Sequence, residues 1–274
     1  MDASGVAWVT GASRGIGRAI ALDLAQAGFD VVAAMRNPAD GEDLAALVGD
    51  GGGSITVQRI DMDDPDTFVV PDGLRVLVNN AGIERQYLPV EHVDIADWRA
   101  VFETNVFGLV ELTARAIPVL RAGGGGVVCN ITSSSILAAI PFYSVYRASK
   151  AAVSAFGESL RCEVAPFGIR VIEIMPGPID TDMLAGSDRM PEAVSYEGYR
   201  EMAEASYEGR KAVDHMTTPA AEAAARVTAA ILDDASPLKH GCDDLSVGLL
   251  DAWSAAPVAL VGSPYDGQGV SQRK

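Results

Sequence analysis

The sequence alternates short apolar runs with longer amphipathic stretches, and this alternation restricts the possible folds more than any other feature. Several of the short runs are continuously apolar, as is typical of strands that are buried on both faces of a parallel sheet. The strands that we predict from them are residues 6–10, 31–35, 55–60, 76–79, 127–132 and 171–175. This rhythm predicts the α/β class, with a doubly wound parallel sheet and helices on both faces.

The stretches between the strands predict the helices. Helical patterns cover residues 15–27, 44–48, 98–120, 144–164 and 219–232. Residues 63–73 are rich in acids and interrupted by proline, so we expect no full crossover helix there. Residues 182–218 are irregular and mix Met and Tyr with charges, and we expect them to form a substrate lid. A Gly/Ser/Gln-rich tail over residues 262–274 is predicted to be mobile.

A glycine-rich loop, Thr10-Gly11-Ala12-Ser13-Arg14-Gly15-Ile16-Gly17, follows the first predicted strand and opens the first helix. Glycines there allow a tight turn and let the backbone approach a pyrophosphate, which the free N–H groups of the helix N-terminus then bind. Such a pattern can also be only a turn, but its strand–turn–helix context favours a dinucleotide. We therefore expect residues 1–274 to form a single Rossmann-type dinucleotide-binding catalytic domain. The predicted contacts from this loop are Gly11, Ser13, Arg14, Gly15, Ile16 and Gly17.

The end of the second predicted strand indicates which dinucleotide binds. An acid at this place would bind the ribose 2′-hydroxyl of NAD. The sequence instead has Arg36 there, and together with Arg14 it can clamp a 2′-phosphate through charge-assisted hydrogen bonds. We therefore predict NADP as the cofactor, although Arg36 could also be a solvated residue at a strand end.

A second motif, Tyr146-Arg147-Ala148-Ser149-Lys150, places a tyrosine and a lysine on one face of a helix. The ordinary pKa of tyrosine is near 10, so acid–base work at neutral pH requires about 4 kcal/mol of extra stabilisation of the phenolate. A nearby ammonium supplies such a field. Taken alone, the pair is common on helices.

Together these motifs resemble those of the classical short-chain dehydrogenases/reductases. The glycine loop, Asn79-Asn80-Ala81-Gly82, Asn105 in Thr-Asn-Val-Phe-Gly, the serine run before the Tyr/Lys motif and the Pro176–Thr181 segment occur in the order and spacing of that family. The resemblance covers roughly residues 5–181. It implies an oxidoreductase that interconverts a carbonyl and a secondary alcohol with a nicotinamide cofactor.

The resemblance also implies a catalytic tetrad. Tyr146 would be the acid in carbonyl reduction or the base in alcohol oxidation, and Lys150 would lower its pKa and bind the nicotinamide ribose. Asn105 would hold a water in the proton relay. The residues alone leave three adjacent serines open for the fourth role, and the family spacing of thirteen before the tyrosine selects Ser133, which would bind the substrate oxygen.

Further cofactor contacts follow from the same resemblance. They are Asp61 and Met62 at the adenine, Asn80, Ala81 and Gly82 in the loop beside the adenosine ribose, and Pro176, Gly177, Ile179 and Thr181 at the nicotinamide. No metal site is expected, because His92, His215 and His240 are widely separated. Cys129 and Cys162 are interpreted as small core residues.

The net charge restricts the partners. The chain has 21 Lys and Arg against 37 Asp and Glu, a net charge of −16, which disfavours nucleic acid and anionic membrane surfaces. Any phosphate-bearing ligand must therefore be held by local groups. Three cysteines without CxxC spacing, no basic leader and no apolar span predict a cytoplasmic protein in a reducing compartment.

The substrate and the assembly are less determined. The Met and Tyr content of residues 182–218, with Ile140, Phe142 and Tyr143 nearby, favours an apolar or aromatic substrate of medium size, although such residues serve equally well in packing. Residues 238–244 depart from the Asp-Gly-Gly turn of family tetramers, so we expect a homodimer through the long helices, with a tetramer as the alternative. The alternative functions are an NAD-dependent dehydrogenase working oxidatively and a non-catalytic NADP-sensing protein of the same fold.

Overall fold

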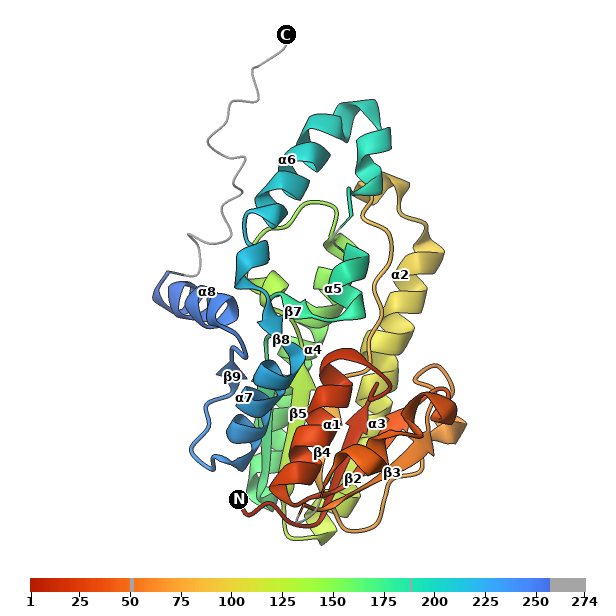
Figure 1. The fold of residues 1–274 in the computed structure, drawn as a ribbon, viewed down its shortest axis with the longest axis vertical. Helices are drawn as coiled ribbons and strands as arrows, with labels where there is room; N and C mark the ends of the chain where they lie inside the picture. The colour runs from red at the N-terminus through yellow and green to blue at the C-terminus, as the bar shows by residue number, and fades with distance from the viewer. Residues whose placement is uncertain (50–51, 188, 257–274) are drawn as a thin grey trace.

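The computed structural model describes residues 1–49, 52–187 and 189–256, and its centre is a seven-stranded parallel sheet (Figure 1). The strands are β1 (Val6–Thr10), β2 (Asp30–Met35), β3 (Ser54–Arg59), β4 (Leu74–Asn79), β5 (Gly126–Ile131), β6 (Ile169–Ile174) and β9 (Lys239–His240). Their spatial order is β3-β2-β1-β4-β5-β6-β9. The order reverses between β1 and β4, and such a switch point is where open α/β sheets bind ligands. The predicted fold class is confirmed.

Helices cover both faces of this sheet (Figure 1). One face carries α1 (Gly15–Ala27) and α7 (Ala220–Leu232), and the other carries α3 (Gly108–Ala122) and α4 (Ser144–Val164). The alternation of side chains on β1 shows how the sheet serves both cores. Val9 packs in the core with α1 and α7, whereas Trp8 packs in the core with α3 and α4.

The long helix predicted over residues 98–120 is divided by an irregular turn. Helix α2 (Ile95–Phe102) continues through a π-helical turn, Glu103–Phe107, into α3. Asn105 lies in that turn, and π-helical turns of this kind frequently occur at functional sites.

The segment of residues 182–218 is more helical than the sequence pattern indicates. It contains α5 (Asp182–Ser187) and α6 (Arg200–Lys211), which lie above the carboxyl ends of the strands in Figure 1. Both ends of the segment are joined by a two-stranded parallel sheet of β7 (Ile179–Asp180) and β8 (Thr218–Pro219). Helix α6 was missed because Ala203 is the residue that it buries, so its apolar stripe is very narrow.

Three smaller expectations have mixed outcomes. Residues 63–73 hold only a short 3₁₀ turn, Pro65–Thr67, as predicted, and the helix expected over residues 44–48 is likewise a 3₁₀ turn, Leu44–Leu47. Cys129 is buried in β5, but Cys162 is exposed on α4, so its assignment to the core was wrong.

The C-terminal part of the described chain adds a strand and a helix. The short strand β9 pairs with β6, and α8 (Asp244–Ala255) follows it. The predicted tail of residues 262–274 lies outside the described residues. Within the described part of the chain, every helix is too short or too polar to cross a membrane.

Candidate active site

A cavity of about 830 Å³ lies at the carboxyl ends of the strands, at the switch point of the sheet. Its walls bring together residues from the glycine loop, the end of β2, the loop after β4, the turn after β5, helix α4 and the segment after β6. The predicted site residues that line it are Gly11, Ser13, Arg14, Gly15, Ile16, Gly17, Arg36, Asp61, Met62, Asn80, Ala81, Gly82, Ser133, Tyr146, Lys150, Pro176, Gly177, Ile179 and Thr181. Asn105 is the predicted residue that lies behind the wall instead.

The glycine loop has the conformation that a phosphate cradle requires. Gly11 and Gly15 adopt φ angles of 66° and 58°, which side chains rarely tolerate. A Cβ on Gly17 would lie 2.2 Å from Asn80 Nδ2, so only glycine lets these segments approach. The N-cap of α1, Arg14, makes no side-chain capping hydrogen bond, and the first residues of this helix, Gly15, Ile16 and Gly17, line the cavity.

Thr10 supports the cavity wall, a role that the sequence analysis did not predict. Its hydroxyl donates to the Val78 carbonyl at 3.3 Å and accepts from the N–H groups of Asn80 and Ala81, each at 3.0 Å. Thr10 therefore fixes the loop after β4 against the end of β1. Its position as the first residue of the glycine motif was the available signal.

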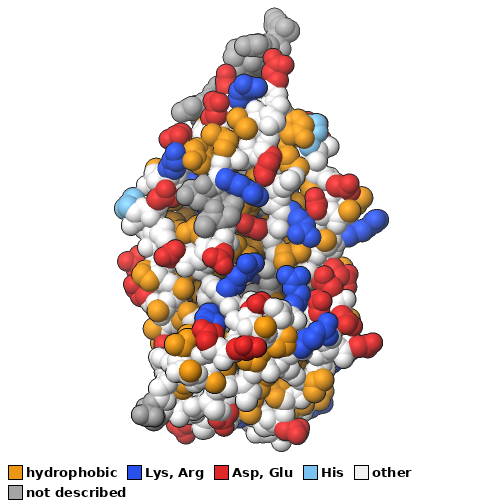
Figure 2. Space-filling model, turned by 45° about the vertical axis from the view of Figure 1, so that its right-hand side comes forward, with side chains coloured by type: hydrophobic (Ala, Val, Ile, Leu, Met, Phe, Trp, Pro, Cys, Tyr) orange, Lys and Arg blue, Asp and Glu red, His pale blue; other side chains and the backbone are white. Residues whose placement is uncertain are grey.

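Two arginines, Arg14 and Arg36, line the cavity beside the glycine loop and the end of β2. Arg36 at the end of β2 is exposed, and Arg14 is also exposed and lies 3.8 Å from the Asp182 carboxylate. Asp40 lines the same end and accepts from Asn37 Nδ2 at 2.9 Å. Figure 2 shows basic side chains across the middle of one face, interspersed with acids, despite the net charge of −16.

Tyr146 and Lys150 lie one turn apart on α4, and both side chains are buried. Lys150 Nζ lies 5.7 Å from the centre of the Tyr146 ring and donates to the Ile131 carbonyl at 2.8 Å. Ser133 follows β5, and its Oγ accepts from the Ser135 N–H at 3.2 Å. The cavity wall thus brings three members of the predicted tetrad together.

Asn105 supports this wall from behind. Its Nδ2 donates to the Ile83 carbonyl at 2.9 Å and to Ser149 Oγ at 3.0 Å, and its Oδ1 accepts from the Ile83 N–H at 2.8 Å. The side chain thereby joins the loop after β4 to α4 through Ser149. The predicted role of Asn105 in holding a water stays a prediction.

Burial governs protonation in this site. Burial raises the pKa of Tyr146, the charge of Glu84 raises it further, and the hydrogen bond with the Ser133 side chain lowers it. Burial lowers the pKa of Lys150 to about 8. At neutral pH the ligand-free site therefore holds a protonated phenol, which is the form that can donate a proton.

A polar cluster beside Tyr146 was not predicted. Tyr87 and Tyr143 donate through their hydroxyls to Glu84 Oε2 at 2.9 and 3.0 Å. The ring of Tyr143 lies 5.0 Å from that of Tyr146 and lines the cavity. Burial raises the pKa of Glu84, which the two hydroxyls partly offset. Glu84 and Tyr87 are neighbours in sequence, and the fold adds Tyr143 from 59 positions away.

Helix α5, at the start of the segment of residues 182–218, forms part of the cavity wall. Met183 and Leu184 from α5 line it. The segment is attached to the loop after β4 by hydrogen bonds from the Tyr87 N–H to Glu192 and from the Ala193 N–H to the Tyr87 carbonyl, at 3.0 and 3.1 Å. The role of this segment as a substrate lid stays a prediction.

Comparison with known proteins shows the family. The family model described as short chain dehydrogenase matches residues 5–192. The chain belongs to the short-chain dehydrogenase family. It is an oxidoreductase of the type that acts on alcohol and carbonyl substrates with a nicotinamide cofactor.

Individual relatives agree with this assignment. Sulfoacetaldehyde reductase of Chromohalobacter salexigens is 35% identical over 205 residues, which are 70% of this chain and 80% of the relative. The crystal structure of a short-chain dehydrogenase from Streptomyces avermitilis matches with a TM-score of 0.77 at 29% identity, over 93% of this chain and 94% of the other. A short chain dehydrogenase from Burkholderia cenocepacia in complex with NADP matches with a TM-score of 0.71 at 27% identity, over 95% and 97%.

Proposed function

We propose that this protein is an NADP(H)-dependent reductase that converts the carbonyl group of a medium-sized, largely apolar substrate into a secondary alcohol. One observation carries the proposal. A single cavity extends from the glycine loop and Arg36 to the protonated Tyr146. A dinucleotide bound along it would have its adenosine end at the arginine and its reactive end at the tyrosine.

The residues of the cavity fit such a cofactor. The positive-φ glycines at positions 11 and 15 and the uncapped start of α1 suit a pyrophosphate. Pro176, Gly177, Ile179 and Thr181 would border the nicotinamide. The nicotinamide supplies the hydride, and the protein supplies orientation and the proton.

The proton step is assigned to residues of this chain. The hydroxyls of Ser133 and Tyr146 would hold the substrate carbonyl oxygen, and the Tyr146 phenol would donate its proton as the alcohol forms. Lys150 is fixed by the Ile131 carbonyl beside the phenol. Its ammonium would stabilise the phenolate that remains after the proton is transferred.

The preference for the phosphorylated cofactor rests on charge. Arg14 and Arg36 lie at the end of the cavity where an NAD-specific site would have an acid. The relative from Burkholderia cenocepacia with bound NADP supports the same choice. The apolar character of the substrate rests on Ile83, Met183 and Leu184 in the wall.

The test is turnover of NADPH by the purified protein with a panel of apolar and aromatic ketones and aldehydes. Tyr146→Phe should lower kcat at least 100-fold, the range expected for general acid catalysis, and leave the NADPH Kd within about threefold. Tyr143→Phe is the comparison, because it removes a hydroxyl from the adjacent wall position, and it should cost less than tenfold. A folded wild-type protein without turnover on the whole panel would refute the proposal.

A further inference from the structure

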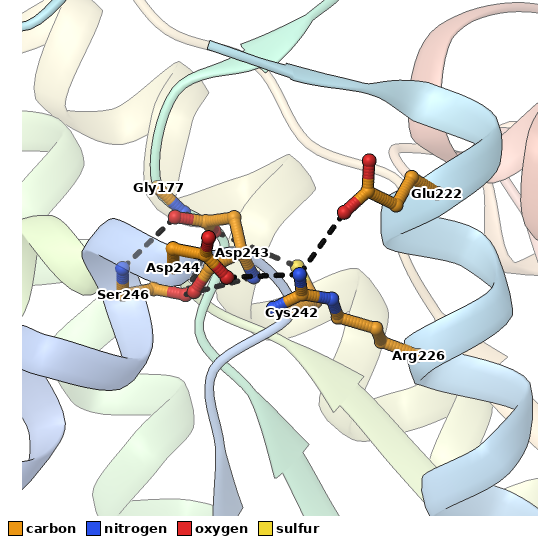
Figure 3. Close-up of polar contacts among 7 residues, drawn as sticks. All are labelled: Gly177, Glu222, Arg226, Cys242, Asp243, Asp244 and Ser246. Atoms are coloured by element: carbon orange, nitrogen blue, oxygen red, sulfur yellow. Dashed lines mark hydrogen bonds and ion pairs between the residues drawn. The ribbon is translucent and has the colours of Figure 1, made fainter. Parts of the chain in front are cut away.

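Asp243 is a buried carboxylate that connects the C-terminal helix to the cavity wall. It is fully buried at the N-terminus of α8. A buried carboxylate requires strong hydrogen-bond partners, because burial removes its contact with water. Its Oδ1 accepts from the Ser246 N–H at 2.8 Å, which caps the helix. Its Oδ2 accepts from Ser246 Oγ at 2.7 Å and from the Gly177 N–H at 2.6 Å. Figure 3 shows Asp243 between these two residues.

The contact with Gly177 is more than helix capping requires. A Ser, Thr, Asn or Asp at the N-cap satisfies the helix with one oxygen. The second oxygen of Asp243 reaches 66 residues back along the chain, to a residue in the cavity wall. A Cβ on Gly177 would lie 2.4 Å from Asp243 Oδ1, so the glycine is what permits this close approach.

The peptide between Pro176 and Gly177 is held on both of its sides. Its N–H donates to Asp243, and its carbonyl accepts from the Ser134 N–H at 2.9 Å. Ser134 directly follows Ser133, and α8 packs against the turn Ser134–Leu137. This one peptide therefore links the Asp243 carboxylate to the turn that directly follows Ser133, the predicted catalytic serine.

We propose that Asp243 is a positioning residue for the reaction centre. Its carboxylate fixes the orientation of the Pro176–Gly177 peptide. This peptide in turn fixes the positions of the wall segment after β6 and of Ser133. Asp243 acts through these groups and touches no reacting atom. The proposal rests on the proposed function, because it assigns to Ser133 and the Pro176–Gly177 wall the task of orienting substrate and cofactor.

Substitution by serine separates the two tasks of Asp243. In Asp243→Ser, the hydroxyl still caps α8, because serine is as good an N-cap as aspartate, but one short side chain cannot also hold the Gly177 N–H. The matched control is Asp244→Ser, which makes the same change in charge one residue later. Asp244 is exposed and pairs with Arg226 of α7 at 2.9 Å, away from Gly177 (Figure 3).

The first measurement is steady-state kinetics with NADPH and a carbonyl substrate found in the panel. We expect Asp243→Ser to lower kcat at least tenfold, to change KM less than threefold and to retain a cooperative melting transition. Asp244→Ser should keep kcat within twofold. A kcat within twofold of wild type for Asp243→Ser, or equal losses in both variants, would overturn the proposal.

The second measurement does not depend on activity. Hydrogen exchange followed by mass spectrometry in the ligand-free protein should show faster exchange of peptides that cover Ser134 and Gly177 in Asp243→Ser, with Asp244→Ser like wild type. If wild-type protein turns over no carbonyl but these peptides exchange faster in Asp243→Ser, the reductase assignment fails, and the role of Asp243 in fixing the Pro176–Gly177 peptide is supported. If exchange is unchanged, the positioning role is wrong whatever the activity.

Discussion

Reversing the charge of Arg36 tests the cofactor preference most directly. Arg36→Asp removes a guanidinium from the cavity end and places there the acid that an NAD site would have. We expect weaker binding of NADPH and tighter binding of NADH. Both effects have the same electrostatic origin, so they should appear together.

The magnitude follows from the exposure of the side chain. A hydrogen bond to a charged group contributes about 1.5–3 kcal/mol, and the lower end applies here because Arg36 is exposed to solvent. A carboxylate about 4 Å from a phosphate adds roughly 1 kcal/mol of repulsion at the dielectric constant of water. The sum is about 2.5 kcal/mol, which corresponds to a rise in the NADPH Kd of about 60-fold.

The assay is titration of NADPH and NADH by fluorescence with wild type, Arg36→Asp and the control Arg59→Asp. Arg59 lies at the end of β3 in register with Met35, is exposed and is outside the cavity lining, so its reversal changes the net charge equally. We expect less than a threefold change in that control. An NADPH Kd for Arg36→Asp equal to that for Arg59→Asp would refute the 2′-phosphate clamp.

Two further variants test electrostatics elsewhere in the molecule. Glu84→Gln removes a charge that raises the pKa of Tyr146, so the phenolate should form more readily. The acidic limb of the pH profile for alcohol oxidation should therefore move to lower pH. A limb that stays in place or moves to higher pH would contradict this effect of the Glu84 charge on Tyr146. Lys239→Met leaves the buried carboxylate of Glu173, which accepts from Lys239 Nζ at 2.8 Å, without its counter-ion. It should lower the free energy of unfolding in urea by about 3 kcal/mol, and adding Glu173→Gln should restore part of that loss; no rescue in the double variant would show that the pair is not coupled.

The sequence predicted the parts of the site that are local in the chain. The apolar runs and the glycine loop carry their information within ten residues, so β1 and the start of α1 were placed correctly. The contacts of Asp243 with Gly177 and of Glu84 with Tyr143 join residues 66 and 59 positions apart, and no local pattern encodes them. Helix α6 lacked a wide apolar face, which is the signal that periodicity requires.

In the proposed reaction, the burial of Tyr146 and Lys150 makes the two directions unequal. Reduction requires a protonated Tyr146, and burial raises the pKa of that phenol, so the required form is present at neutral pH without further cost. Oxidation requires the phenolate, which high pH favours, together with the Lys150 ammonium that stabilises it. Burial lowers the pKa of Lys150 to about 8, so the ammonium is lost as the pH rises through that value. In the proposed reaction, the form with both a phenolate and an ammonium is therefore a minor one at every pH, whereas the form that reduction would use, with Tyr146 protonated and Lys150 charged, predominates below a pH of about 8.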